Sequence, residues 1–256
     1  NLIDVNVSKN LPNLTVGTQT FMGCTSLDNI DFLPSNTIAI GAYAFSGSGI
    51  STAKIPSSVT SMGVGVFENC PNLTVARMSA GLSEISDRMF SGDSLLTSVS
   101  IGTNITRIGN QAFASTGLTD VNIPYVDGNA VEIGEQAFLN CGGLTEVTLP
   151  LNVEKIGDGA FNSCVNLKAL FIPKDVTLTD GGSNLVSPST YKVTYEGDIN
   201  ATPPTAKIVS IESGSQAGSL VDVPTYIVIN NETDEGLKLY VNEVDSGYHL
   251  SLIHIS

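Results

Sequence analysis

The side chains that most often carry out chemistry are few in this sequence and lie far apart. The two histidines, His249 and His254, fall near the C-terminal end, and we expect them to be strand residues rather than proton-transfer groups or metal ligands. The paired carboxylates Asp234 and Glu235 lie in a polar segment, where solvated charge is the usual explanation. No phosphate-binding loop, dinucleotide fingerprint or calcium loop is present. We therefore expect no enzymatic activity, no metal and no cofactor.

The four cysteines share one position relative to a recurring phenylalanine. Cys24, Cys70, Cys141 and Cys164 each follow a phenylalanine by three residues. This fixed offset indicates one repeated structural position, where small thiols fill the inside of a turn. Cys24 and Cys70 are two repeats apart, about 10 Å at a strand spacing near 4.8 Å, which is too far for a disulfide. Cys141 and Cys164 are in adjacent repeats, so a disulfide between them stays open as an alternative.

The phenylalanines themselves recur every 22–25 residues. Seven are in register: Phe21, Phe45, Phe67, Phe90, Phe113, Phe138 and Phe161. Four positions before each stands a small residue, which is glycine in all repeats except one, where it is Ser86. A glycine recurring once per repeat predicts a tight corner at positive φ.

After each phenylalanine comes a leucine-like residue and then an alternating apolar pair, as in Leu118, Val121 and Ile123. Such alternation with β-branched residues predicts a short strand with one buried face. Each repeat therefore predicts a strand, a corner, a second extended stretch, a glycine corner and a Phe-bearing turn. A period of about 23 residues is typical of a β-rich solenoid in which each repeat stacks on its neighbours.

The same register predicts incomplete repeats at both ends. Leu2, Val5 and Val7 match the strand pattern, so we expect an earlier repeat truncated at this point, and Val193 belongs to the last strand. Nine strands are expected in all. They would form one right-handed solenoid with a parallel sheet over residues 1–197.

The C-terminal quarter of the chain changes in character. The segment 176–190 lacks the phenylalanine and predicts a degenerate capping repeat, which covers the open end of a solenoid core. Residues 198–204 are expected to be a linker. Residues 205–256 show no repeat, and apolar runs between polar turns predict a small all-β module or part of a truncated immunoglobulin-like sandwich.

Composition and charge restrict the partners. Hydrophobic residues make up 41% of the chain and charged residues 14%, so the surface must consist mainly of Ser, Thr, Asn and Gly. The net charge of −14 repels phosphate backbones and anionic lipids. Nucleic acid and insertion into a membrane are therefore not expected. The first 20 residues lack a signal-peptide pattern, but the chain begins inside a repeat, so an upstream signal is still possible.

Several units resemble the BspA-like leucine-rich repeats. The resemblance is carried by ITRIGNQAF at 105–113, by the segment 118–124, and by VEKIGDGAFNSCVNL at 153–167, and it extends over residues 1–195. It implies a leucine-rich-repeat solenoid in a secreted or surface-anchored protein of a host-associated bacterium. Some such proteins are adhesins for extracellular host proteins such as fibronectin or fibrinogen. The resemblance does not identify a ligand, because the repeating residues are those that build the solenoid.

The outward strand positions are the candidate binding site, because on a solenoid they form a continuous surface. These positions vary from repeat to repeat while the inward positions do not. One interval is longer than its counterparts and predicts a protruding loop at Tyr125–Asn129. The predicted contact residues are Lys54, Arg77, Asp120, Asn122, Tyr125, Glu146 and Phe171.

The sequence thus predicts a non-enzymatic, monomeric module, secreted or on the cell surface, that binds an extracellular host or bacterial protein or a glycan. Two alternatives stay open. The solenoid would otherwise be a structural stalk without a ligand of its own, or a set of accessory repeats of a larger surface enzyme. Aromatic residues clustered on the outward surface would favour binding.

Overall fold

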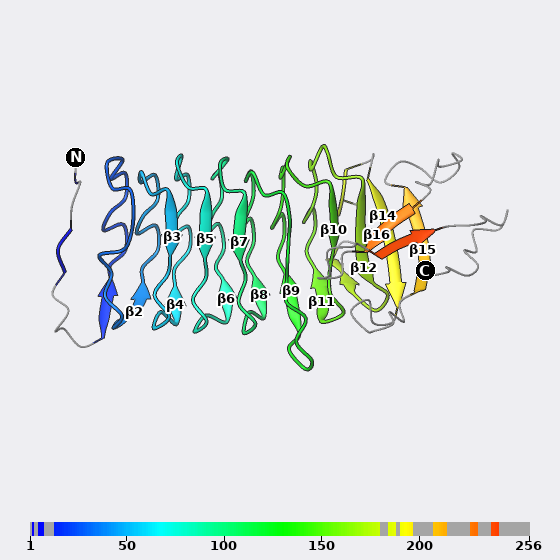
Figure 1. Cartoon of the computed structure of the whole chain (residues 1–256), viewed down its shortest axis with the longest axis horizontal. Helices are drawn as coiled ribbons and strands as arrows, with labels where there is room; N and C mark the ends of the chain where they lie inside the picture. Colours follow the sequence, from blue (N-terminus) through cyan, green and yellow to red (C-terminus); the bar gives the residue numbers. More distant parts are fainter. Residues whose placement is uncertain are drawn as a thin grey trace.

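The chain winds into a stack of similar turns along one long axis (Figure 1). The computed structural model describes residues 2, 5–7, 13–179, 184–187 and 190–196, and three later strands at 207–213, 226–229 and 237–240. Regular structure in these residues consists of short β-strands without any α-helix. The strands of successive turns pair in parallel, which confirms the predicted solenoid.

Each turn contributes to two strand-bearing faces, whose labels follow one another along the stack in Figure 1. Strands of the first face follow the phenylalanine of their repeat, except for β14, whose repeat has none, and are β3 (Thr52–Lys54), β5 (Val75–Arg77), β7 (Ser98–Ser100), β10 (Glu146–Thr148), β12 (Ala169–Pro173) and β14 (Tyr191–Glu196). Strands of the second face precede the glycine corner and are β1 (Leu14–Val16), β2 (Thr37–Ile40), β4 (Ser61–Met62), β6 (Glu84–Ile85), β8 (Arg107–Ile108), β9 (Val131–Ile133), β11 (Val153–Ile156) and β13 (Thr177–Leu178). The two faces enclose one apolar core.

A column of seven phenylalanine rings runs through this core. All neighbouring rings from Phe21 to Phe161 are stacked, with centroids 5.0–5.7 Å apart and planes within 10° of parallel. Main-chain hydrogen bonds repeat beside the rings: the N–H of Phe90 donates to Ala112 O at 2.8 Å, and that of Phe113 to Ala137 O at 2.8 Å. The backbone ladder thus sets the spacing at which the rings stack.

The recurrent glycine is needed for a different reason from the one predicted. None of these glycines has a positive φ; the left-handed residues lie two positions before and two after each phenylalanine, such as Gln111 and Ser115. A Cβ on Gly41 would lie only 2.6 Å from the backbone nitrogen of Thr18 in the preceding turn. The prediction of positive φ was wrong, because what the glycine supplies is close approach between the backbones of adjacent turns.

Ser86, the exception in the glycine column, coincides with a break in the second face. Elsewhere the glycine N–H donates to the strand carbonyl of the preceding turn, as from Gly109 to Ile85 O at 2.7 Å. At Ser86 it is the hydroxyl that donates, to Met62 O at 2.5 Å. Strands β4 and β6, on either side of this position, belong to separate sheets. Ser86 stands where the other repeats have glycine, and its side-chain hydrogen bond takes the place of the backbone hydrogen bond that the glycines form.

The first face is interrupted at a different turn. The alternation predicts a strand at Leu118–Ile123, and Val121 and Ile123 are buried as expected. This segment nevertheless forms no strand, so the face divides into β3–β5–β7 and β10–β12–β14, the latter extended by β15 (Lys207–Ser213). At the N-terminal end, Asn29 makes only a single bridge to Thr52. Among the described residues this face has fewer strands than the alternation predicts, because alternation reports which side chains are buried and not whether two backbones are close enough to pair.

The C-terminal end continues the solenoid and then changes direction. Leu185 is buried and its carbonyl accepts the N–H of Phe161, so the phenylalanine-free turn carries on the ladder. Strand β14 pairs with β12 in parallel and with β15 (Lys207–Ser213) in antiparallel orientation. Strands β16 (Tyr226–Ile229) and β17 (Leu237–Tyr240) pair with each other. The expected linker at 198–204 lies outside the described residues.

Replacing Phe113 by alanine should destabilise the solenoid by about 3–5 kcal/mol, because it removes a fully buried ring and leaves a cavity between Phe90 and Phe138. Urea denaturation monitored by circular dichroism measures the change. Leu95, which is 52% exposed, is the control, and Leu95→Ala should alter stability by less than about 0.5 kcal/mol. A loss below about 1 kcal/mol for Phe113→Ala would contradict the ring column.

Candidate functional site

Lys54 and Arg77 are cross-strand neighbours on the outer surface of the first face. They are register partners at the ends of β3 and β5, and both side chains are exposed. Adjacent strands lie about 4.8 Å apart. Two like charges directly opposite each other disfavour the sheet. Neither residue forms a salt bridge with any residue that the structure describes.

The other two arginines are neutralised. Arg107 on β8 contacts Glu84 at 3.4 Å and Asp87 at 2.5 Å, and Arg88 pairs with the buried carboxylate of Glu68. Partial burial lowers the pKa of Arg107, but the hydrogen bonds that its guanidinium donates to Asp87 and Glu84, together with the negative charges of these two carboxylates, outweigh burial and raise the pKa. Arg77 is thus the one arginine that forms no salt bridge among the residues that the structure describes.

The predicted contact residues on the C-terminal side of β7 do not form one continuous surface with Lys54 and Arg77. Asp120 and Asn122 are exposed, but they lie on the segment that pairs with neither neighbouring strand. Glu146 on β10 is half-buried, and burial raises the pKa of its carboxyl group. Lys54, Arg77, Asp120 and Glu146 come from four of five successive turns on one side of the stack, and the turn of β7 separates the basic from the acidic pair.

The predicted loop protrudes beyond the neighbouring turns, next to β9 (Figure 1). Tyr125 in this loop is 44% exposed. The base of the loop is held by Asn129, whose Nδ2 donates to Thr103 O and Ile105 O, each at 3.1 Å. Asn152 in the next turn donates to Asn129 O at 2.9 Å. The exposed aromatic ring is therefore carried on an anchored loop.

Phe171 is not a surface residue, and its prediction as a contact was wrong. It is the register partner of Thr148 on the outer side of β12, yet only 2% of its side chain is exposed. Val193, its partner on β14, is equally buried. The period-two rule assigned Phe171 to the outer side of its strand, but it does not tell whether another part of the chain covers that side. The face therefore loses the aromatic anchor expected at its C-terminal end.

The position three residues after each phenylalanine forms a polar ladder inside the turns. All four cysteines are free; Cys70, Cys141 and Cys164 are buried, whereas Cys24 is half-buried. The buried thiols each donate to the phenylalanine carbonyl of the preceding turn, as Cys70 Sγ does to Phe45 O at 3.1 Å. The prediction of buried thiols is confirmed for these three residues.

Asp93 occupies the same position and was not singled out from the sequence. Its side chain is fully buried, its Oδ1 accepts the N–H of Cys70 at 2.7 Å, and its Oδ2 has no partner among the described residues. Burial, and to a lesser extent the nearby Glu68, raise the pKa of Asp93 to about 9. A neutral carboxyl can donate to a carbonyl as the thiols do. The available signal was an acid where the other repeats have Cys, Ser or Thr.

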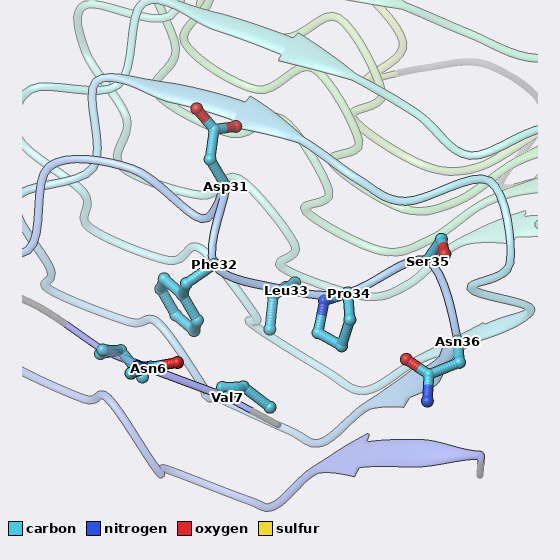
Figure 2. A pocket seen from close by; sticks show the side chains of 9 residues that line it. Asn6, Val7, Asp31, Phe32, Leu33, Pro34, Ser35 and Asn36 are labelled. Carbon is cyan, nitrogen blue, oxygen red and sulfur yellow. The ribbon is translucent and has the colours of Figure 1, made fainter. Parts of the chain in front are cut away.

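A pocket of about 410 Å³ lies near the N-terminal end (Figure 2). Residues 5–7, which form no strand, line one side and residues 31–36 line the other. The carboxylate of Asp31 and the amide of Asn36 point away from each other, so the polar groups do not converge on one ligand position (Figure 2). The pocket does not define a binding site.

Two other kinds of site are absent from the described residues. These residues contain no group of three or more His, Cys, Asp or Glu side chains placed to hold a metal ion. They also contain no helix with the length and apolar character needed to cross a membrane. The candidate site is therefore the outer surface of the first face between β3 and β10.

The repeated turn, with its phenylalanine column and parallel strands, defines a leucine-rich-repeat protein. The BspA type leucine rich repeat region matches the chain in six copies, over residues 1–119 and 106–184. The chain therefore belongs to the BspA-type leucine-rich repeat family. No curated protein matches it.

Similar solved structures are bacterial repeat proteins. The leucine rich repeat protein of T. pallidum is 30% identical, covers 66% of this chain and 68% of its own, and has a TM-score of 0.48. A leucine-rich repeat protein from Bacteroides ovatus is 19% identical over 74% of this chain and 76% of its own (TM-score 0.41). A leucine rich cell surface protein from Faecalibacterium prausnitzii is 24% identical over 63% and 52% (TM-score 0.44).

Asp93 should make the solenoid less stable as the pH rises. Its folded pKa of about 9 exceeds the ordinary value of 3.8, so the native state holds a proton that the unfolded chain releases between these values. The stability from this group is complete below about pH 4 and falls by up to about 1.4 kcal/mol per pH unit until about pH 9. Asp93→Asn should flatten the decline, whereas the exposed Asp120→Asn should not. Urea unfolding at pH 5, 7 and 9 measures this, and equal slopes for wild type and Asp93→Asn would contradict a buried acid.

Thiol accessibility should separate Cys24 from the other cysteines. Cys24 is half-buried and should react with a thiol reagent in the native state. Cys70 should not, because burial first, and the nearby Asp93 second, raise the pKa of its thiol to about 12. Titration should find one reactive thiol before denaturation and four after it. A total of two after denaturation would instead reveal a bridge between Cys141 and Cys164.

Proposed function

We propose that this solenoid is a non-enzymatic binding module, displayed on the bacterial surface or secreted, that engages an extracellular protein through the first face between β3 and β10. The observation that carries the proposal is the pair of exposed, unneutralised cations Lys54 and Arg77, placed side by side in a chain of net charge −14. A like-charged pair disfavours the isolated sheet and is relieved when an acidic partner binds. A buried guanidinium contact is also a frequent source of interface energy.

The location is supported by the family. BspA-type leucine-rich repeats are repeats of a bacterial surface type, and one similar structure is described as a cell surface protein. Within the face, Tyr125 supplies an exposed aromatic ring close to the acidic residue Asp120 in sequence. Asn122 and Glu146 complete the set of polar groups that a partner would meet along the stack.

A structural stalk is the second candidate. It is favoured by the small, neutral side chains of Ser98 and Ser100 in the middle of the face and by the burial of Phe171. A stalk needs only the stack of turns and no contact residue. The two functions are separated by whether the folded solenoid binds any extracellular protein.

Arg77→Ala should weaken binding to a matrix protein about tenfold, which corresponds to about 1.4 kcal/mol. Immobilised fibronectin, fibrinogen and other extracellular-matrix proteins serve as partners, and surface plasmon resonance gives the affinities. Tyr125→Ala should weaken the same interaction. Lys168→Ala is the matched control, because Lys168 is an exposed lysine four repeats after Arg77.

Circular dichroism checks that every variant is folded. Binding by the wild type that neither Arg77→Ala nor Tyr125→Ala reduces would place the contact on another surface. Absence of binding to every matrix protein would favour the stalk.

A further inference from the structure

The charges along the first face follow a definite order. At the position of Lys54 and Arg77, the preceding repeat has the exposed Asp31 and the following repeat has Ser100. Asp120 comes in the next repeat, on the neighbouring outward position. The basic strip, defined as Lys54 and Arg77, is thus two strands wide and is bounded by a carboxylate on each side along the stack.

The strip keeps its charge although carboxylates are near. Asp31 is one repeat from Lys54, and yet the two form no salt bridge. On the second face the equivalent neighbours do pair, as Lys155 does with Glu132 at 3.9 Å. The basic strip is therefore the place on the described surface where two adjacent cations face solvent with no counter-charge in contact.

These boundaries decide what kind of anion fits. A long polyanion, such as a sulfated glycan, that ran along the stack would approach Asp120 two turns beyond Arg77 at one end, and at the other it would meet Asp31 about one strand spacing of 4.8 Å from Lys54. That distance is within the screening length of about 8 Å at physiological salt, so the repulsion would be felt. The net charge of −14 repels each additional negative charge as well. A ligand with only two or three negative charges and neutral flanks avoids both costs.

We infer that the basic strip of Lys54 and Arg77 binds a short acidic segment of a protein partner, with carboxylates placed on the two cations and neutral residues on either side. This inference rests on the proposed function and names the chemistry of the partner at the same site. The planar guanidinium of Arg77 accommodates one carboxylate in bidentate fashion, and the ammonium of Lys54 takes a second as a compact point charge.

The surroundings of the strip suit an extended segment. In an extended chain, alternate side chains point the same way and recur about 6.6 Å apart. The long, flexible stems of lysine and arginine span this distance from Cα positions about 4.8 Å apart. The exposed side chains of Thr52, Ser98 and Ser100 flank the strip with hydroxyl groups and leave the surface open to a peptide backbone.

The test uses the whole chain and three probes. The first probe is a synthetic peptide, Gly-Ser-Asp-Gly-Asp-Gly-Ser, with blocked ends; the second has Asn in place of both Asp; the third is a heparin oligosaccharide. Titrations followed by amide chemical shifts suit the weak binding expected of exposed ion pairs. The protein variants are Lys54→Gln with Arg77→Gln, and Lys168→Gln as the control.

The acidic peptide should shift the amides of β3 and β5 and bind at least about fivefold more tightly than the Asn peptide at 50 mM salt. The double variant should lose this preference, Lys168→Gln should keep it, and 0.5 M salt should abolish it. Equal binding of both peptides, an unchanged preference in the double variant, or tighter binding of heparin than of the acidic peptide would overturn the inference. If a matrix protein still binds through Arg77 in that case, the proposed function stands and only the partner chemistry is wrong.

Discussion

The constraint on which the molecule depends is the uniform spacing of its turns. Hydrogen bonds between the backbones of successive turns fix that spacing, and the phenylalanine rings stack at 5.0–5.7 Å because of it. The rings in return fill the interior that the short strands cannot fill alone, since a strand of two or three residues buries little by itself. Other recurring residues adapt to the same spacing. Glycine is required where two backbones approach most closely, and the buried cysteines fit where a side chain donates to the phenylalanine carbonyl of the turn before it.

Much of this arrangement was predictable, because the same residue types recur at the same offsets in every repeat. The positions of the phenylalanine column, the two strand stretches and the buried thiols all follow from offsets within one period. What could not be predicted is local. A recurrent glycine such as Gly41 can be needed for a positive φ or for close approach of two backbones, and the sequence does not distinguish these reasons. The φ of Gly41 and its distance to the backbone of Thr18 do. The alternation of Val121 and Ile123 locates buried side chains without revealing that their backbone is unpaired.

The candidate site was harder to predict than the fold, because it consists of residues that do not repeat. Sequence position assigned Arg77 and Phe171 to the same outward column, yet one is exposed and unpaired while the other is buried. A period of 23 residues assigns both to one column and carries no information on which of them is covered. Asp93 illustrates the same limit within the core, where one acid is buried in a column of thiols and hydroxyls and burial raises the pKa of its carboxyl group.

The interruptions of the two faces occur at different turns. The second face parts between β4 and β6, and the first face parts at the segment that follows β7. Within the described turns, no plane perpendicular to the stack axis therefore meets a break in both faces. At each gap the opposite face and the phenylalanine column remain continuous. A force along the axis pulls on the hydrogen bonds between strands, which lie along that axis, and at each gap an intact strand pair of the opposite face still opposes it.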